Sequence, residues 1–151
     1  MSLGTKPYKR GLMDLGNGGF AWLQPDGSWG WSNAGLIVDG EESLLVDTLF
    51  DLELTGEMLA AMRGAVPAAR DIGTLVNTHS NGDHCNGNSL LPHAEIIASK
   101  ATTEEMPHES PAVMAEYLSV APQLGDMGEF FLHCFGQFKF SGVEQIGRAH
   151  V

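Results

Sequence analysis

Short apolar runs separated by glycine-rich turns dominate the chain from residue 11 to residue 46. Asn17-Gly18-Gly19, Pro25-Asp26-Gly27 and Asp39-Gly40 are typical turn sequences, because Asn, Asp and Gly tolerate positive φ and Pro fixes φ near the value that a turn needs. The pattern therefore predicts four successive strands that form an N-terminal meander. The expected strands are residues 11–15, 20–24, 34–38 and 43–46.

Beyond residue 46 the apolar residues take on helical spacing. They recur at mostly three- and four-residue intervals over 51–65, where Asp51 is a suitable N-cap. Residues 72–76 and 95–98 are apolar runs with little charge, as expected of strands buried on both faces. Weaker helical patterns follow, one beginning at a sequence that resembles a capping box, Thr102–Glu105, and one over 111–120. The alternation of strands and helices predicts an α/β (α+β) fold.

Composition narrows the possible partners. The chain has 151 residues and a formal net charge of −11, which repels phosphate backbones and anionic lipid, so we expect no nucleic-acid or membrane partner. No apolar run approaches the ~20 residues of a membrane span, and the N-terminus lacks the apolar stretch of a signal peptide. Two cysteines do not indicate a disulfide framework. We expect a cytoplasmic protein that acts on a small-molecule substrate.

Candidate chemistry is concentrated in residues 78–88, directly after the predicted strand at 72–76. His79, Asp83 and His84 lie within six residues, and a loop that leaves a rigid strand can direct several side chains at one point. Imidazole and carboxylate groups are the donors that zinc and related metals prefer. Gly82 allows the backbone to turn sharply between them. A metal site is therefore favoured over a polar loop with incidental histidines.

This loop resembles the signature T-H-x-H-x-D-H of the metallo-β-lactamase superfold, which follows a buried strand. The chain has Thr78-His79-x-Asn81-x-Asp83-His84, and Leu44–Thr48 resembles the strand of that family that ends in Asp. The resemblance implies the first half of a four-layer αββα fold, and residues 1–144 are expected to form this truncated domain.

The resemblance also implies roles for individual residues. His79 would ligate the metal at a first position, and Asp83 and His84 at a second, while Asp47 would hydrogen-bond and orient the loop. The implied cofactor is one or two zinc ions, with iron or manganese as alternatives. Asp83 would also orient or deprotonate the attacking water. The implied reaction is hydrolysis, in which a metal-bound hydroxide attacks an ester, lactone, thioester, lactam or phosphoester.

Asn81 departs from this pattern, since the family has a second His there. An amide oxygen is a weaker zinc donor than imidazole, so we expect one firmly held metal at Asp83 and His84, and weak binding at His79 and Asn81. Two alternatives stay open, a metal-free relative and a non-catalytic binding or scaffold domain with a degenerate site. An iron-dependent oxidoreductase is less favoured, because its loop would offer a further carboxylate.

Three other residues have two interpretations each. Trp29 and Trp31 either form a substrate rim above the metals or pack across a sheet. Cys85 directly follows His84 and is either a soft metal ligand or, as we favour, a small buried side chain.

The last seven residues, 145–151, are predicted to be a non-native tail, because they can be encoded by a nucleotide string that contains a common sequencing adapter. His150 is otherwise a candidate third ligand, since Gly147–Val151 faintly resembles a Gly-x-Ala-His ligand motif. Two or three ligands from one loop leave a four-coordinate site incomplete, so we expect the fragment alone to be inactive. The oligomeric state is not predicted.

Overall fold

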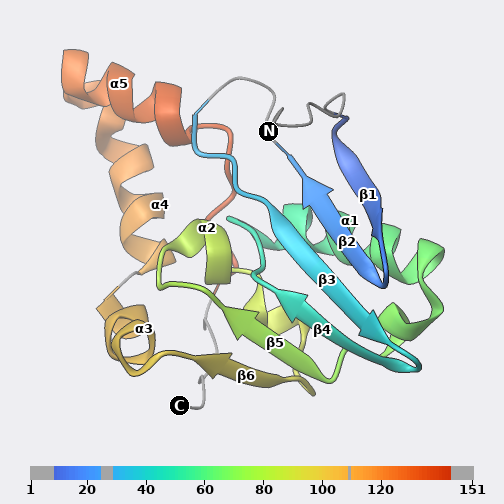
Figure 1. Cartoon of the computed structure of the whole chain (residues 1–151). Helices are drawn as coiled ribbons and strands as arrows, with labels where there is room; N and C mark the ends of the chain where they lie inside the picture. Colours follow the sequence, from blue (N-terminus) through green and yellow to red (C-terminus); the bar gives the residue numbers. More distant parts are fainter. Residues whose placement is uncertain (1–8, 25–28, 109, 144–151) are drawn as a thin grey trace, which may run out of the picture.

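The structure, a computed structural model, describes residues 9–24, 29–108 and 110–143, which form a six-stranded sheet with helices packed against it (Figure 1). The strands lie in the sheet in chain order. Their bounds are β1 Gly11–Gly16, β2 Gly19–Leu23, β3 Ala34–Asp39, β4 Glu42–Val46, β5 Thr74–Asn77 and β6 Glu95–Ala98.

The N-terminal meander is confirmed. β1 to β4 pair antiparallel through successive hairpins, whereas β4, β5 and β6 pair parallel. The turn between β1 and β2 contains Asn17 at φ 53° and Gly18 at φ 77°, which is the left-handed backbone that the Asn-Gly sequence predicts. Two-residue turns join β1 to β2 and β3 to β4, whereas each parallel pair needs a crossover segment.

The crossover from β4 to β5 contains the longest helix, α1 Leu52–Ala65, and the 3₁₀ turn η1 Pro67–Arg70. Asp51 is its N-cap as predicted, and its Oδ1 accepts a hydrogen bond from the Leu54 amide at 2.8 Å. No helix in the described part of the chain is long and apolar enough to cross a bilayer. The remaining helical segments are α2 Gly82–Cys85, η2 Asn88–Leu90, α3 Lys100–Glu105, η3 Met106–His108, α4 Pro111–Val120, η4 Ala121–Gln123 and α5 Asp126–Phe135.

Several predicted boundaries were wrong. The strand expected at 72–76 is β5, which begins at Thr74 because pairing with β4 starts there, opposite Leu44. The capping box at Thr102 does not form, because Ser99 accepts the Thr102 amide with its side chain and starts α3 earlier. The loop expected over 77–88 contains α2 and ends at the first residue of η2. The turn at 25–27, the tail at 145–151 and His150 lie outside the described residues.

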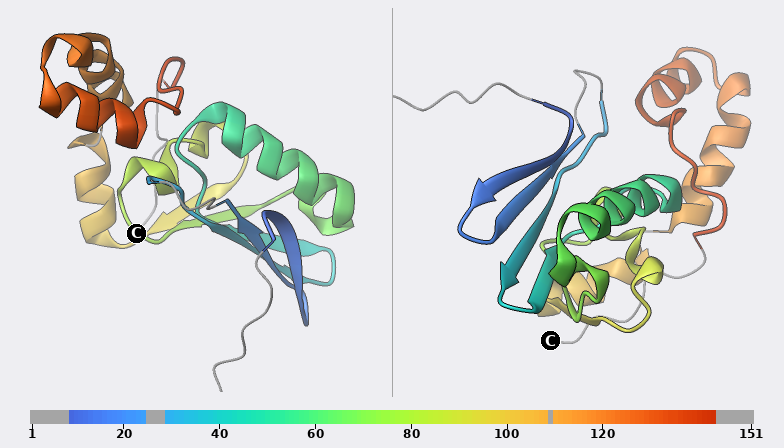
Figure 2. Two further views of the ribbon diagram at one scale, coloured as in Figure 1. Left: turned by 90° about the horizontal axis from the view of Figure 1, so that it is seen from above. Right: turned by 90° about the vertical axis from the view of Figure 1, so that its right-hand side faces the viewer.

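The core lies between α1 and one face of the sheet (Figure 2). A cross-strand row on that face packs against Met58, Leu59 and Met62 of α1, and all of these side chains are buried. The row consists of Leu36, Leu45, Leu75 and Ile96. The opposite face carries a second apolar row, Val46, Val76 and Ile97, with Ile97 39% exposed. The described residues thus form one sheet layer and one helical layer, two of the four layers that the resemblance implies.

Two glycines provide a matched test of how tightly the loop after α2 packs on α1. A Cβ on Gly87 would lie 2.0 Å from Thr55 Oγ1, whereas a Cβ on Gly64 meets nothing within 4 Å. We expect Gly87→Ala to lower the free energy of unfolding by about 3 kcal/mol through overpacking. Gly64→Ala should raise the free energy of unfolding by about 0.5–1 kcal/mol, because Ala has less backbone entropy than Gly in the unfolded chain and therefore loses less when the helix forms. Chemical denaturation of both variants measures this, and equal effects would contradict the described contact.

Candidate metal centre

The candidate residues meet where the parallel strands end. β4 is followed directly by Asp47, and β5 is followed by Thr78 and the segment that leads into α2. The carboxyl ends of parallel neighbours lie at the same edge of a sheet, so Asp47 and the loop come together although they are 31 residues apart in sequence. Figure 1 shows α2 at this edge, with α4 and α5 beyond it.

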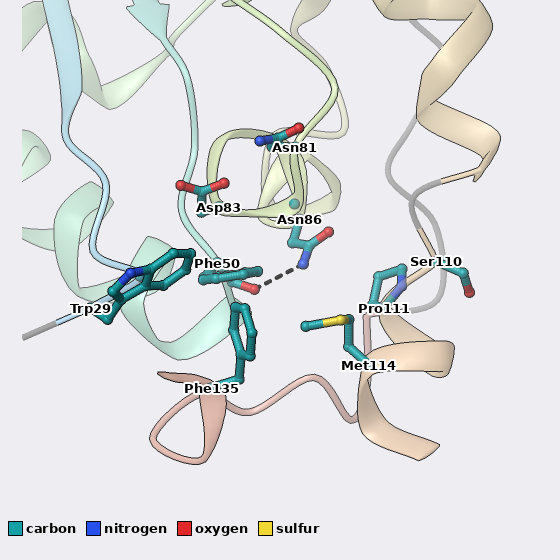
Figure 3. Close-up of a pocket in the computed structure, with 11 residues that line it drawn as sticks. Trp29, Phe50, Asn81, Asp83, Asn86, Ser110, Pro111, Met114 and Phe135 are labelled. Atoms are coloured by element: carbon teal, nitrogen blue, oxygen red, sulfur yellow. Dashed lines mark hydrogen bonds between the residues drawn. The ribbon is translucent and has the colours of Figure 1, made fainter. Parts of the chain in front are cut away.

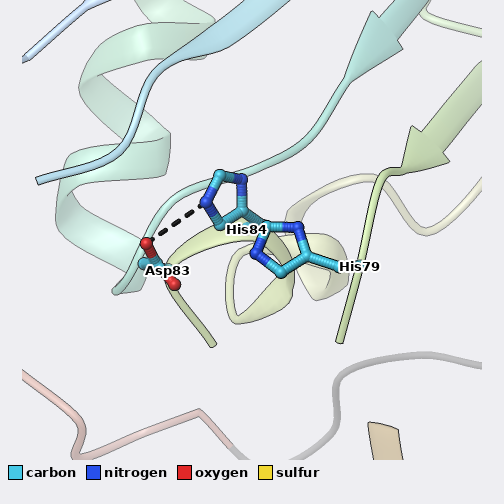
Figure 4. A group of neighbouring side chains, drawn as sticks. All are labelled: His79, Asp83 and His84. Atoms are coloured by element: carbon cyan, nitrogen blue, oxygen red, sulfur yellow. Dashed lines mark ion pairs between the residues drawn. The ribbon is translucent and has the colours of Figure 1, made fainter. Parts of the chain in front are cut away.

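His79, Asp83 and His84 converge at this edge (Figure 4). One potential ligand atom from each lies within 4.8 Å of the others. His84 Nε2 is 3.2 Å from Asp83 Oδ2, and the two imidazole centroids are 4.1 Å apart. The structure therefore brings His79 into one group with Asp83 and His84.

Asp47 supports this group through hydrogen bonds to His84 and to Thr78, the residue before His79. Its side chain is buried and accepts three hydrogen bonds, from the Thr78 amide at 2.8 Å, the Thr78 hydroxyl at 2.7 Å and His84 Nδ1 at 3.0 Å. The backbone of Asp47 adopts φ 63°, a left-handed conformation that Asp tolerates better than most residues. The role expected for Asp47 as the residue that orients the loop agrees with these contacts.

The same hydrogen bonds determine which imidazole nitrogens face the group. The Thr78 hydroxyl donates its one proton to Asp47, so it accepts from His79 Nδ1, 2.9 Å away. His84 Nδ1 likewise donates to Asp47. Both imidazoles thus carry a proton on Nδ1 and direct Nε2 away from these partners, which is the arrangement that supports metal ligation by Nε2.

His84 has an unusual protonation equilibrium in the metal-free chain. Partial burial works against the charged imidazolium, but hydrogen bonds and charge attraction from Asp47 and Asp83 outweigh it and raise the pKa of His84 to about 9. At neutral pH the imidazole is therefore protonated on both nitrogens, and Asp83 accepts from Nε2. Zinc binding at Nε2 would therefore require the loss of this proton.

A buried amide network fixes the backbone of α2 and was not anticipated as part of the site. The His84 carbonyl accepts from the Thr48 amide and from Asn77 Nδ2, both at 2.9 Å. Asn88 Nδ2 donates to Asn77 Oδ1 at 2.8 Å, and the Thr48 hydroxyl donates to Asn88 Oδ1 at 3.0 Å. The sequence did contain a signal for this network. Thr48 and Asn77 are polar residues at the ends of two buried strands, and Asn88 is a polar residue at the end of the loop.

The donor set fits a zinc ion. Two imidazole nitrogens and one carboxylate oxygen are typical zinc ligands. Zinc bonds of ~2.0–2.2 Å place neighbouring ligand atoms roughly 3.4 Å apart, and the Asp83–His84 separation of 3.2 Å already agrees. Three donors leave one of the four tetrahedral positions to be filled from elsewhere.

Asn81 and Cys85 lie beside this group in different roles. Asn81 immediately precedes α2, its carbonyl accepts the His84 amide at 2.9 Å, and its exposed side chain lies at the rim of a cavity (Figure 3). The Cys85 thiol is buried and donates to the Ser80 carbonyl at 3.1 Å, so the interpretation as a small buried residue is confirmed. Cys85 and Cys134 are both buried.

The two tryptophans considered for a substrate rim occupy different surroundings. Trp29 lines the cavity that begins at Asp83 (Figure 3). Trp31 packs edge-on against Phe138, with ring centroids 5.2 Å apart, and lies under the Arg10 guanidinium. The segment that carries both is joined to α2 by a hydrogen bond from the Ser32 hydroxyl to the Asp83 carbonyl.

Comparison with known proteins gives one family and several solved structures. Residues 27–144 match the model of the metallo-beta-lactamase superfamily. A metallo-beta-lactamase from Erythrobacter litoralis, crystallised with beta-mercaptoethanol in the active site, is similar over 65% of this chain and 45% of its own, with 27% identity and a TM-score of 0.52. One from Pseudomonas aeruginosa in a mono-zinc form is 21% identical over 68% of this chain and 48% of its own, with a TM-score of 0.53. The chain thus spans about half the length of these structures.

Proposed function

The chain belongs to the metallo-beta-lactamase superfamily, and from this premise we propose that it provides one part of the metal site of a metal-dependent hydrolase. The observation that carries the proposal is the convergence of His79, Asp83 and His84 above Asp47. The proposed substrates are small molecules with an ester, lactone, thioester, lactam or phosphoester bond. A non-catalytic scaffold would not need three metal donors in one group.

Each residue of the group has a defined part in the proposed site. His79 and His84 would hold zinc through Nε2, and Asp83 would hold it through a carboxylate oxygen. When bound, zinc supplies a Lewis acid that polarises the scissile carbonyl or phosphoryl group and makes water more acidic. Asp83 also accepts a proton from the attacking water and orients it, because a carboxylate beside the site is a suitable general base. Asp47 keeps both imidazoles in the required tautomer through His84 and Thr78.

The chain by itself is proposed to bind zinc weakly and to be inactive. Its described residues supply three strong donors, and Asn81 offers only an amide oxygen where the family pattern has imidazole. An incomplete coordination sphere lowers affinity and leaves the metal poorly positioned for chemistry.

Zinc titration of the 151-residue chain tests the proposal. We expect saturable binding of one zinc per chain, monitored by competition with a chromophoric chelator, and at least a tenfold loss of affinity in His79→Ala and in His84→Ala. His93→Ala is the matched control and should bind zinc like the parent chain, because His93 lies outside the group. Two tightly bound zinc ions would contradict the single weak site, and equal affinity of all four proteins would exclude this metal centre.

A further inference from the structure

A cavity of about 320 Å³ opens beside Asp83, between α2 and the α4–α5 pair (Figure 3). It shares Asp83 with the metal group, so a molecule bound in the cavity would extend to the reaction site. Its volume is at the lower end of the range of small-molecule sites, which is about 300–1,000 Å³. A ligand group of the size of one aromatic ring or a short alkyl chain is therefore appropriate.

The walls of the cavity are largely apolar and come from three distant parts of the sequence. Trp29 and Phe50 face it from one side, Phe135 of α5 from below, and Pro111 and Met114 of α4 from the other side (Figure 3). Phe135 is held in place by edge-on contacts with Trp29 and Phe50, with centroids 5.5 Å and 6.1 Å apart. An apolar wall that is fixed by its own packing favours apolar ligand groups.

The charge of the cavity excludes one class of ligand. Asp83 is its one charged group among the described lining residues, and no Lys, Arg or His of the described chain lines it. An anionic ligand group would lose hydration without gaining a cationic partner and would face the Asp83 carboxylate. The cavity therefore suits an uncharged group.

Asn86 provides a polar contact point in this apolar setting. Its side chain is 2% exposed and projects toward the space between Phe50 and Pro111 (Figure 3). Nδ2 donates to the Phe50 carbonyl at 3.0 Å, whereas Oδ1 has no hydrogen-bond partner among the described residues. Buried acceptors without a partner are rare and costly, so a ligand N–H or O–H at this point would relieve the cost. Gly82 packs directly against this amide, since a Cβ on it would lie 2.8 Å from Asn86 Nδ2.

We propose that this cavity binds an uncharged aryl or short alkyl group of the substrate, together with an adjacent N–H or O–H that donates to Asn86 Oδ1. The inference rests on the proposed function in that it identifies the bound molecule as the substrate of the neighbouring metal site. It assigns to α4 and α5 the role of one wall of the substrate site. Met114 and Phe135 then determine which substrates fit.

Binding of N-benzylacetamide to the metal-free 151-residue chain tests this inference without requiring turnover. The probe is uncharged and joins one phenyl ring to an amide N–H. We expect NMR shifts at the Trp29 indole and the Met114 methyl group. Benzyl acetate, which lacks the N–H, should bind about 2–10-fold more weakly, as expected for the loss of one hydrogen bond. Phenylacetate, which is anionic, should bind at least tenfold more weakly.

Two tryptophan substitutions on α4 provide the matched comparison. Met114→Trp fills the cavity and should weaken binding of N-benzylacetamide at least tenfold. Val113→Trp adds the same side chain at a neighbouring exposed position that does not line the cavity, and should leave the affinity unchanged within a factor of two.

The outcomes separate this inference from the proposed function. Equal binding to both tryptophan variants, equal binding of phenylacetate, or shifts confined to other residues would overturn the cavity as an uncharged substrate site. Zinc affinity is measured independently by the titration above. Loss of zinc binding with intact binding of N-benzylacetamide would refute the proposed metal site alone, and the opposite result would refute the cavity alone.

Discussion

Replacing Asp47 with Ala is expected to weaken zinc binding by about 10–100-fold and to lower the free energy of unfolding by about 3–5 kcal/mol. Both effects follow from one buried carboxylate that accepts hydrogen bonds from the Thr78 amide, the Thr78 hydroxyl and His84 Nδ1. Without it, three donors lose their acceptor, and His84 loses the group that fixes its ring. The expected stability loss is large because unsatisfied buried donors retain their desolvation cost.

The backbone conformation of Asp47 adds to the loss of stability that is expected for Asp47→Ala. Asp47 has φ 63°, and Ala disfavours left-handed backbone by roughly 1–2 kcal/mol. Asp47→Asn separates the two contributions, because Asn tolerates this backbone but has only one acceptor oxygen. We therefore expect Asn to give an intermediate stability and a zinc affinity closer to that of Ala than to that of Asp.

Denaturant unfolding in the presence of chelator and competitive zinc titration measure the two quantities separately. Asp71→Ala is the control for loss of one negative charge, because Asp71 is exposed and lies outside the metal group. It should change the zinc affinity by less than twofold. Zinc binding by Asp47→Ala that equals that of the parent chain would show that Asp47 supports the fold but does not position the ligands.

The chemistry of the site was more predictable from the sequence than its architecture. His79, Asp83 and His84 could be found because they are close in sequence and of metal-binding types, and the structure brings them within 4.8 Å of one another. Asp47 could be identified only through the resemblance, since its partners Thr78 and His84 lie at least 31 residues away. The N-terminal meander was predictable because Asn-Gly and Asp-Gly turns are local signals.

The remaining features depend on contacts between distant segments. α3 begins directly after Ser99 because that side chain caps it where β6 ends, and a capping-box pattern at Thr102 does not contain this information. Asn77 and Asn88 help to fix the backbone of α2 through a buried hydrogen-bond network with Thr48, and this network forms only when β4 and β5 pair. The cavity joins Trp29, Phe50 and Phe135, which no periodicity in the sequence relates. Positions of this kind follow from tertiary packing.

Zinc affinity should rise about tenfold per pH unit between pH 7 and about pH 9 and then level off. In the metal-free chain, His84 has a pKa of about 9 because of hydrogen bonds to Asp47 and Asp83 that outweigh its desolvation. Zinc must displace the proton from Nε2, so each unit of pH below the pKa costs a factor of ten in apparent affinity. A histidine with an ordinary pKa near 6.5 would give nearly constant affinity over this range.

Stability should fall with pH in the metal-free chain and stay nearly constant in the zinc-bound chain. The pKa of His84 is higher in the folded chain than in the unfolded chain, so its contribution to metal-free stability is complete below pH ~6.5 and is lost as the pH rises through about 9. With excess zinc, the rise in zinc affinity with pH offsets this loss, so the stability of the zinc-bound form stays nearly constant over the same interval. Denaturation between pH 6 and 9.5, with and without zinc, should therefore give diverging curves. His84→Gln should abolish the slope of the metal-free curve and His93→Gln should retain it, whereas parallel curves for the parent chain would show that zinc does not replace the His84 proton.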